Sequence, residues 1–379
     1  MNEAAAKSRR FLTDDPAPPE VYEVGREIIH GVLDRAKPQF EAQGKSLSYS
    51  EWILDYFRVS AGRERPDKEN YFITFDRTVP WSLFSDISAF VDVAANRLGD
   101  QEYSEIFGDV LEPGQIGILP AGWDALECRD TIFERALVWL FHHELGHLFQ
   151  DHERIRKENA PEGVDITLFV DEMMSKSEAL ASDMRLSWVY HATEFAADHQ
   201  ALHYSIFYAD AKQSVASAKD ISKGSIWCLV CAVAYMFHFF FSDRLYADVL
   251  EVAEGSHPDP TMRLAMLTGH LVQLLDWKSV RVNAPNAPSL EDAEKIVSSA
   301  EAAVGVYWAL THADADKALK LTDVLGRLLK CQDSILKYQI RLASVWNELR
   351  PEIMKTYFGE NRAHVMDVAP PAGGPSVGI

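Results

Sequence analysis

The sequence of 379 residues contains only four cysteines, at positions 128, 228, 231 and 331. Four cysteines at these spacings do not form the dense pattern of a secreted protein stabilised by disulfides, which excludes that class. Cys228 and Cys231 form a C-x-x-C pair, but they lie inside an apolar run. We therefore interpret them as small buried side chains on a helix, in preference to a redox or zinc pair.

The sequence also lacks an excess of basic residues. Lys and Arg together number 37 against 57 Asp and Glu, which gives a formal net charge of −20. A nucleic-acid-binding protein gains much of its affinity by neutralising phosphates, so this balance argues against a nucleic-acid partner. The apolar content of 47% and the charged content of 25% are those of an ordinary globular protein that can bury a large core.

Long hydrophobic runs are missing as well. Residues 1–20 are charged and Pro-rich, with no apolar core of the kind that a secretory signal needs. The longest apolar run, Ile226 to Phe241, has 16 residues and contains His238. A membrane-spanning helix needs about 20 residues, so we predict a buried central helix, no membrane association and a cytoplasmic location.

The motif that carries chemistry is His143-Glu144-Leu145-Gly146-His147. On a helix, His143 and His147 project from one face toward a single metal ion, and Glu144 can reach a metal-bound water as general base. Thr131 to Glu134 reads as a capping box that begins this helix, and apolar residues recur behind it at helical spacing. Gly146 is unfavourable inside a helix, which indicates that another backbone passes close to the metal side.

A zinc site needs a third protein ligand. The spacing of metzincins would place a histidine at position 153, where this chain has Glu153, so we set that class aside. Glu194 and Asp198 lie four residues apart downstream, on one face of an expected helix. Glu194 can bind the metal, while Asp198 can accept a hydrogen bond from the outer nitrogen of a ligand histidine.

H-E-L-G-H followed by E-x-x-A-D resembles the gluzincin metallopeptidases, as in the group containing HtpX and the CaaX-processing proteases. The resemblance covers about 60 residues. It implies a Zn²⁺ cofactor bound by His143, His147 and Glu194, with Glu144 as base and Asp198 as orienting residue. Among soluble members the chain is most similar to the Lit-type phage-exclusion peptidases, although the membrane spans of the HtpX group are not evident.

The same resemblance extends to the segment His257-Pro-Asp-Pro-Thr-Met-Arg263. In gluzincins an H-P followed by an Arg often returns toward the active site, so His257 or Arg263 could donate to the oxyanion of a tetrahedral intermediate. A proline-containing turn that carries polar residues by chance is an equally good interpretation.

Periodicity predicts a mostly α fold (α+β): a zincin-like catalytic core with a small edge sheet, and a C-terminal helical region. Strands are expected over 71–79 and 115–119, either of which could be the edge strand that pairs with substrate. An exposed loop is expected over 153–164. Helices are expected over 21–40, 87–98, 171–186, 189–210, 226–241, 261–275, 290–310, 315–329 and 333–349. The expected domains are a flexible tail at 1–20, a metallopeptidase domain at 21–276 with its active-site core at 126–265, a helical region at 277–365 and a disordered tail at 366–379.

The function that these features predict is zinc-dependent hydrolysis of peptide bonds in an intracellular protein substrate by an endopeptidase, with Glu144 activating the zinc-bound water. One alternative is a repressor-cleaving protease of the ImmA type, although that pattern has Asn where Asp198 stands and this chain shows no obvious helix-turn-helix. Another is a non-enzymatic helical interaction protein with a structural metal site. The sequence does not determine the oligomeric state.

Overall fold

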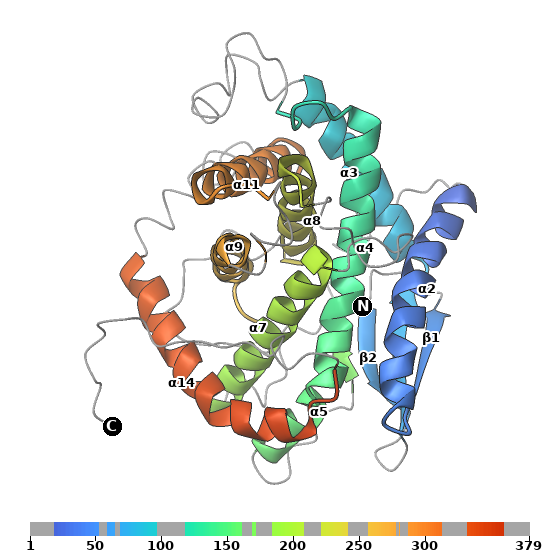
Figure 1. Cartoon of the computed structure of the whole chain (residues 1–379), viewed down its shortest axis with the longest axis vertical. Helices are drawn as coiled ribbons and strands as arrows, with labels where there is room; N and C mark the ends of the chain where they lie inside the picture. Colours follow the sequence, from blue (N-terminus) through green and yellow to red (C-terminus); the bar gives the residue numbers. More distant parts are fainter. Residues whose placement is uncertain are drawn as a thin grey trace.

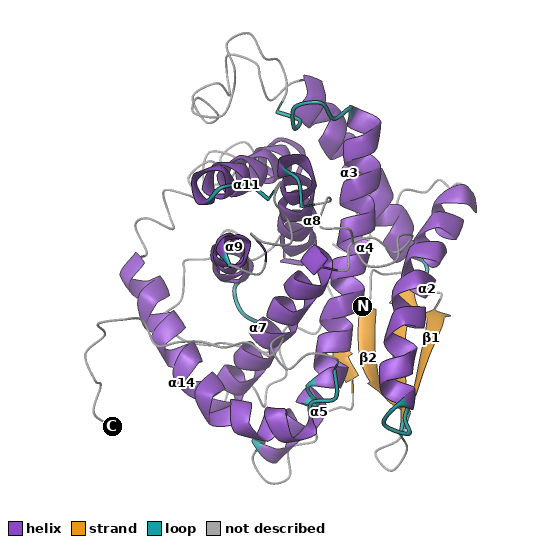
Figure 2. Ribbon diagram, viewed as in Figure 1, coloured by secondary structure: helices purple, strands orange, loops and turns teal. Residues whose placement is uncertain are grey.

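The computed structural model of the chain describes residues 19–52, 59–64, 69–96, 118–160, 169–171, 184–207, 221–241, 257–277, 280, 287–312 and 332–359. These residues form a mostly helical fold with one small mixed sheet near the N-terminus, as the sequence predicts (Figures 1 and 2). The helices are α2 (Pro19–Glu41), α3 (Thr78–Asn96), α4 (Ala125–Phe149), α5 (His152–Glu158), α7 (Met184–Phe207), α8 (Lys223–Phe241), α9 (Pro260–Asp276), α11 (Leu290–His312) and α14 (Gln332–Thr356). The strands are β1 (Ser46–Trp52), β2 (Val59–Arg63), β3 (Asn70–Asp76) and β4 (Phe169–Asp171).

The sheet has the strand order β1-β3-β2-β4. β1 runs parallel to β3 with Ser46 opposite Asn70, while β2 is antiparallel to both β3 and β4. The strand expected over 71–79 is therefore β3, and it ends at Asp76. Because β3 pairs on both sides, the prediction that it could be a free substrate-binding edge is wrong; among the described strands, β1 and β4 are at the edges. Of the other expected strand, 115–119, only residues 118 and 119 are described, and they are not in a strand.

α4 is the central helix of the described structure. In Figure 1 it runs between the sheet and α2 on one side and a group of helices that includes α7, α8 and α9 on the other. Its second half, from Ala136 to Phe149, is buried on every face, because both sides pack against it. A helix that is enclosed in this way can hold polar groups only where they find partners inside the protein.

The apolar run at 226–241 is helical, and the prediction that it is buried is confirmed for residues 226–237, the part whose side chains the structure describes. It lies in α8, where residues 226–237 are all buried, including Cys228 and Cys231. Both thiols are free, as expected for small packing residues. Among the described helices, none has the length and apolar character needed to cross a membrane.

Three helix boundaries differ from the sequence predictions. α4 begins at Ala125 instead of Thr131, because the Asp124 carboxylate accepts a hydrogen bond from the Glu127 amide and caps the helix a turn and a half earlier. α3 begins at Thr78, where Asp76 caps the chain as it leaves β3. The loop expected over 153–164 is helical up to Glu158, in α5.

The remaining helical predictions agree with α2, α7, α9, α11 and α14, each to within about seven residues at either end. In the helix expected over 171–186, residue 171 is instead the end of a strand, and the chain is helical from residue 184. The part between them lies outside the described residues. The expected helix at 315–329 and the disordered tail at 366–379 also lie outside them, as does the N-terminal tail except for Pro19 and Glu20, which begin α2. The domain division at residue 277 stays a prediction; α11 packs on α8 and α14 packs on α7.

Candidate metal centre

The two histidines of the H-E-x-x-H motif face each other inside α4. Their Nε2 atoms are 3.0 Å apart and both rings are buried. Glu194 approaches from α7, with its Oε2 atom 3.4 Å from His143 Nε2 and its Oε1 atom 3.5 Å from His147 Nε2. The structure therefore brings together the three ligands that the sequence predicts.

The spacing of these three donors fits a single metal ion. Bonds of about 2.0–2.2 Å in tetrahedral geometry separate neighbouring ligand atoms by about 3.3–3.5 Å, close to the distances observed. Two imidazole nitrogens and one carboxylate oxygen also match the ligands of known metal sites that have three protein ligands. The buried His143, His147 and Glu194 are thus consistent with an H-E-x-x-H metal site.

Asp198 orients the first histidine. It lies one helical turn after Glu194 on α7, and its Oδ1 atom is 2.9 Å from His143 Nδ1. An N–H at Nδ1 that donates to this carboxylate leaves the Nε2 lone pair directed at His147 and Glu194. Asp198 is itself held by Arg263 of α9, whose Nε and Nη2 groups donate to its two oxygens at 2.8 and 2.7 Å.

The second histidine is oriented by a residue that the sequence did not single out as functional. His152, the first residue of α5, places its Nδ1 atom 2.8 Å from His147 Nδ1, and both rings are buried. This contact occupies the outer nitrogen of His147 and leaves Nε2 for a metal. It depends on Asp151, which adopts a left-handed conformation (φ 52°) between α4 and α5 and turns the chain back toward the site.

Arg156 is the other residue that was missed. Its Nη2 group donates to Glu194 Oε1 at 2.7 Å and its Nε group donates to Thr193 Oγ1 at 2.8 Å. The guanidinium also lies over the Tyr190 ring, 4.4 Å from its centre. Arg156 is buried and therefore compensates a buried carboxylate with a fixed geometry. Nothing in the local sequence signals this role, because it requires α5 to fold back against α7.

The charges around Glu194 set its protonation state. Burial alone would raise the pKa of Glu194, but the nearby His257 and His147, the contact with His143 and the Arg156 charge lower that pKa well below its ordinary value. Burial lowers the pKa of His147 well below 6.5, and burial with the Arg156 charge does the same to the pKa of His152. The centre therefore holds an ionised Glu194 carboxylate beside a neutral His147 ring, the forms in which these two groups bind a metal.

Gly146 explains how closely the two metal-binding helices approach. A Cβ atom built at this position would lie 3.0 Å from the Ala197 Cα atom and 3.3 Å from the Ala197 carbonyl oxygen. Gly146 on α4 thus faces the backbone of α7 next to Asp198, which confirms the expectation that another backbone passes close to the metal side. Any side chain here would force apart the helices that carry the ligands.

Two of the remaining predicted site residues, His257 and Arg263, also lie at the centre. Glu144 follows His143 on α4 and is completely buried. His257, just before α9, places its Nε2 atom 3.8 Å from Glu194 Oε1, and Arg263 Nη2 is 3.6 Å from Glu194 Oε2. The Pro-containing segment at 257–263 therefore does return to the metal centre. The roles of these residues in catalysis stay predictions.

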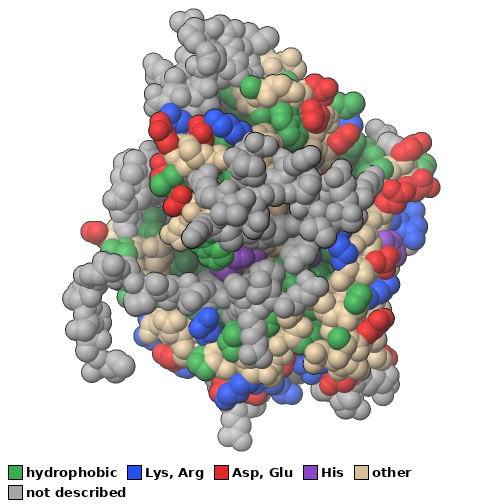
Figure 3. All heavy atoms as spheres, viewed as in Figure 1, with side chains coloured by type: hydrophobic (Ala, Val, Ile, Leu, Met, Phe, Trp, Pro, Cys, Tyr) green, Lys and Arg blue, Asp and Glu red, His purple; other side chains and the backbone are tan. Residues whose placement is uncertain are grey.

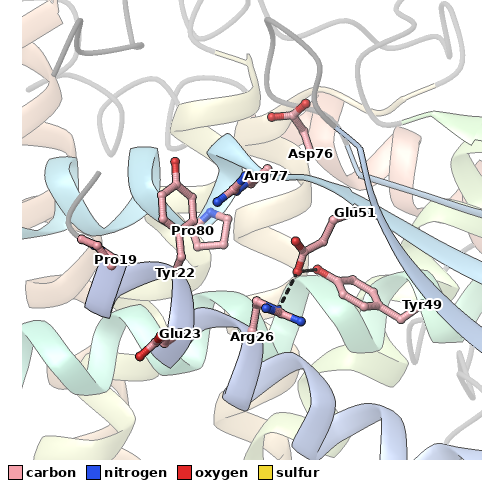
Figure 4. Close-up of a pocket in the computed structure, with 9 residues that line it drawn as sticks. All are labelled: Pro19, Tyr22, Glu23, Arg26, Tyr49, Glu51, Asp76, Arg77 and Pro80. Carbon is pink, nitrogen blue, oxygen red and sulfur yellow. Dashed lines mark hydrogen bonds and ion pairs between the residues drawn. The ribbon is translucent and has the colours of Figure 1, made fainter. Parts of the chain in front are cut away.

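A separate cavity of about 590 Å³ lies between α2 and β1 (Figure 4). Its lining comes from α2, β1 and the junction of β3 with α3, and it includes Tyr22, Tyr49 and Arg77. Arg26 and Glu51 form an ion pair of 3.1 Å within it. No residue of the metal centre lines this cavity, and its mixed charges do not form a metal-ligand set.

No protein-family model, curated protein or solved structure matches the chain.

Proposed function

We propose that the protein is a zinc-dependent endopeptidase of the gluzincin type that cleaves a protein substrate. The observation that carries this proposal is the buried group of His143, His147 and Glu194, with Asp198 behind His143. Two imidazoles and one carboxylate suit Zn²⁺, whereas Mg²⁺ and Ca²⁺ favour ligand sets made of oxygens. Three protein ligands leave a fourth position for a reacting group, as in catalytic zinc sites.

A bound zinc ion would supply Lewis-acid polarisation of the scissile carbonyl and of the attacking water. Glu144 stands next to the ligand His143 and takes the proton of that water, then delivers it to the leaving amine. Its burial strengthens this role, because a carboxylate shielded from bulk solvent exchanges its proton with the reactants and not with the medium.

The contacts of Arg263 and His257 suggest different roles for the two. Arg263 donates two hydrogen bonds to Asp198, so we assign it to positioning that carboxylate and, through it, His143. His257 lies on the Glu194 side of the centre and is the better candidate for a donor to the developing oxyanion.

The test is the Glu144→Gln variant, which keeps the size of the side chain and both histidines but removes the base. Zinc content and melting temperature should match the wild type, while cleavage of proteins in a cell lysate should fall by roughly 10²–10⁴-fold. Glu127→Gln, an exposed change near the start of the same helix, is the matched control and should cleave normally. Asp198→Asn should instead loosen zinc binding by about 10–100-fold.

Each outcome has a clear meaning. Loss of cleavage in Glu144→Gln with unchanged zinc content supports the peptidase. If the wild type cleaves nothing and Glu144→Gln retains every biological effect of the protein, the non-enzymatic interaction protein takes its place. A repressor as the protein that is cleaved would favour the ImmA-type alternative.

A further inference from the structure

A second group of histidines lies outside the centre described above. His199 and His203 are one turn apart on α7, and His270 faces them from α9. The Nε2 atoms of His203 and His270 are 3.1 Å apart, and each of the three residues offers a ring nitrogen within 4.8 Å of the other two. The ring centres of His199 and His270 are 4.0 Å apart.

This group is built into the core and opens toward the surface. His199 and His203 are buried, whereas His270 is half-buried and Trp277, at the end of α9, is 42% exposed. The Trp277 ring stands edge-on to His203 and His270, with centres 5.6 and 6.4 Å away. Figure 3 shows that histidine side chains are visible near the centre of this face of the molecule.

The two groups share the same pair of helices. α7 contributes Asp198 to the first and His199 to the second, and α9 contributes Arg263 to the first and His270 to the second. Seven residues of helix separate Arg263 from His270, or about 10 Å along α9. The second group is therefore a distinct site and not an extension of the first.

We propose that His199, His203 and His270 form a second metal site, which takes a divalent transition ion of the Zn²⁺ or Cu²⁺ class. The observation that supports this proposal is the convergence of three imidazoles from two helices at distances that one ion can bridge. This proposal is independent of the peptidase activity.

The donor set determines which ions this site selects. Three imidazoles suit Zn²⁺, Cu²⁺, Ni²⁺ and Co²⁺, whereas Mg²⁺ and Ca²⁺ require oxygen ligands. Burial lowers the pKa of His270 to about 4, so its ring is neutral at pH 7 and needs no proton removed before it binds. Without a carboxylate ligand, this site should bind more weakly than the first and exchange its ion more readily.

A hydrogen bond between two neutral imidazoles is the competing account of the 3.1 Å contact. One ring would donate an N–H to the other, and no ion would be needed. In that account the hydrogen bond joins His203 to His270, and His199 only packs against the two rings, with ring centres 4.5 and 4.0 Å away. An ion would engage all three rings and would cross-link α7 to α9 two turns from Arg263.

Zinc stoichiometry after equilibration with excess Zn²⁺ tests the proposal. The wild type should bind two ions per chain, and His147→Ala and His270→Gln should each bind one, with folding checked by circular dichroism. Gln273→Ala, an exposed change one turn further along α9, is the matched control and should keep both ions. A folded His270→Gln that binds as many ions as the wild type overturns the proposal, whatever the number that the wild type binds.

A second measurement needs no histidine variant. Cu²⁺ bound at this site lies beside Trp277 and should quench its fluorescence, which the difference between wild type and Trp277→Phe isolates. Saturable quenching of this difference signal by Cu²⁺, with no effect of Mg²⁺, supports the site. A difference signal that Cu²⁺ leaves unchanged contradicts it.

Discussion

Gly146 offers a direct test of how the metal centre is held. Replacing it with Ala adds one methyl group between α4 and α7. The atoms that this methyl group would meet belong to Ala197, two of them to its backbone, so no side chain can rotate away. The helices must separate by a few tenths of an ångström, or the substitution is not accommodated.

Two opposing effects set the magnitude. Gly→Ala in the interior of a helix stabilises it by about 1 kcal/mol. Inserting a methyl group into a packed interface typically costs about 1–3 kcal/mol. Gly269, in the interior of α9, supplies the reference, because it is exposed and a Cβ atom there meets nothing within 4 Å. Gly269→Ala should therefore gain the full helix propensity, and the difference between the two variants should be about 1–3 kcal/mol.

Urea denaturation of both variants in the presence of a chelator measures this difference. We expect Gly269→Ala to unfold at a higher urea concentration than the wild type and Gly146→Ala at a lower one. Zinc affinity should fall in Gly146→Ala alone, since α4 carries His143 and His147 while α7 carries Glu194. If Gly146→Ala is as stable as Gly269→Ala and binds zinc as the wild type does, the close approach of the helices is not what shapes the site.

Three further outcomes follow from single contacts. Arg156→Met leaves Glu194 buried without its closest charged partner and should destabilise the metal-free protein by about 3–5 kcal/mol, but by less with zinc bound, as denaturation with and without chelator will show. Asp124→Ala removes the cap of α4 and should cost about 1 kcal/mol, whereas the exposed Asp130→Ala should have little effect in the same assay. Burial raises the pKa of Glu301 to about 7 from an ordinary 4.5, so its contribution to stability is full below pH 4.5 and is lost as the pH rises through 7. Glu301→Gln should remove this pH dependence of stability, which is worth up to about 3 kcal/mol between pH 5 and pH 8. Melting temperatures measured across this pH range test the prediction, and a wild type whose stability does not fall as the pH rises contradicts it.

The metal ligands could be predicted because helical spacing decides their geometry. Four-residue separations place His143 with His147 and Glu194 with Asp198, whatever the rest of the fold does. The close approach of the two helices could also be predicted from the sequence, since a glycine in a buried helix indicates a close neighbour.

The residues behind the ligands could not be predicted in the same way. His152 and Arg156 reach the site only because Asp151 takes a left-handed turn, and a non-glycine residue gives little warning of that conformation. Only part of the second histidine group is visible in the sequence. His199 and His203 have the same four-residue spacing as the H-E-x-x-H pair, but their partner His270 lies 67 positions further along the chain and only the packing of α9 reveals it.

The distance in sequence between the first two ligands and Glu194 has a kinetic consequence. His143 and His147 are local to each other, but about 50 residues separate them from Glu194, and Arg263 follows about 70 residues later. A short segment with all its ligands close together can capture its ion while it is still unfolded; α4 alone presents only two of the three ligands. A metal ion at this centre would therefore bind only after α7 has docked, late in folding, and would hold together helices that already pack against each other.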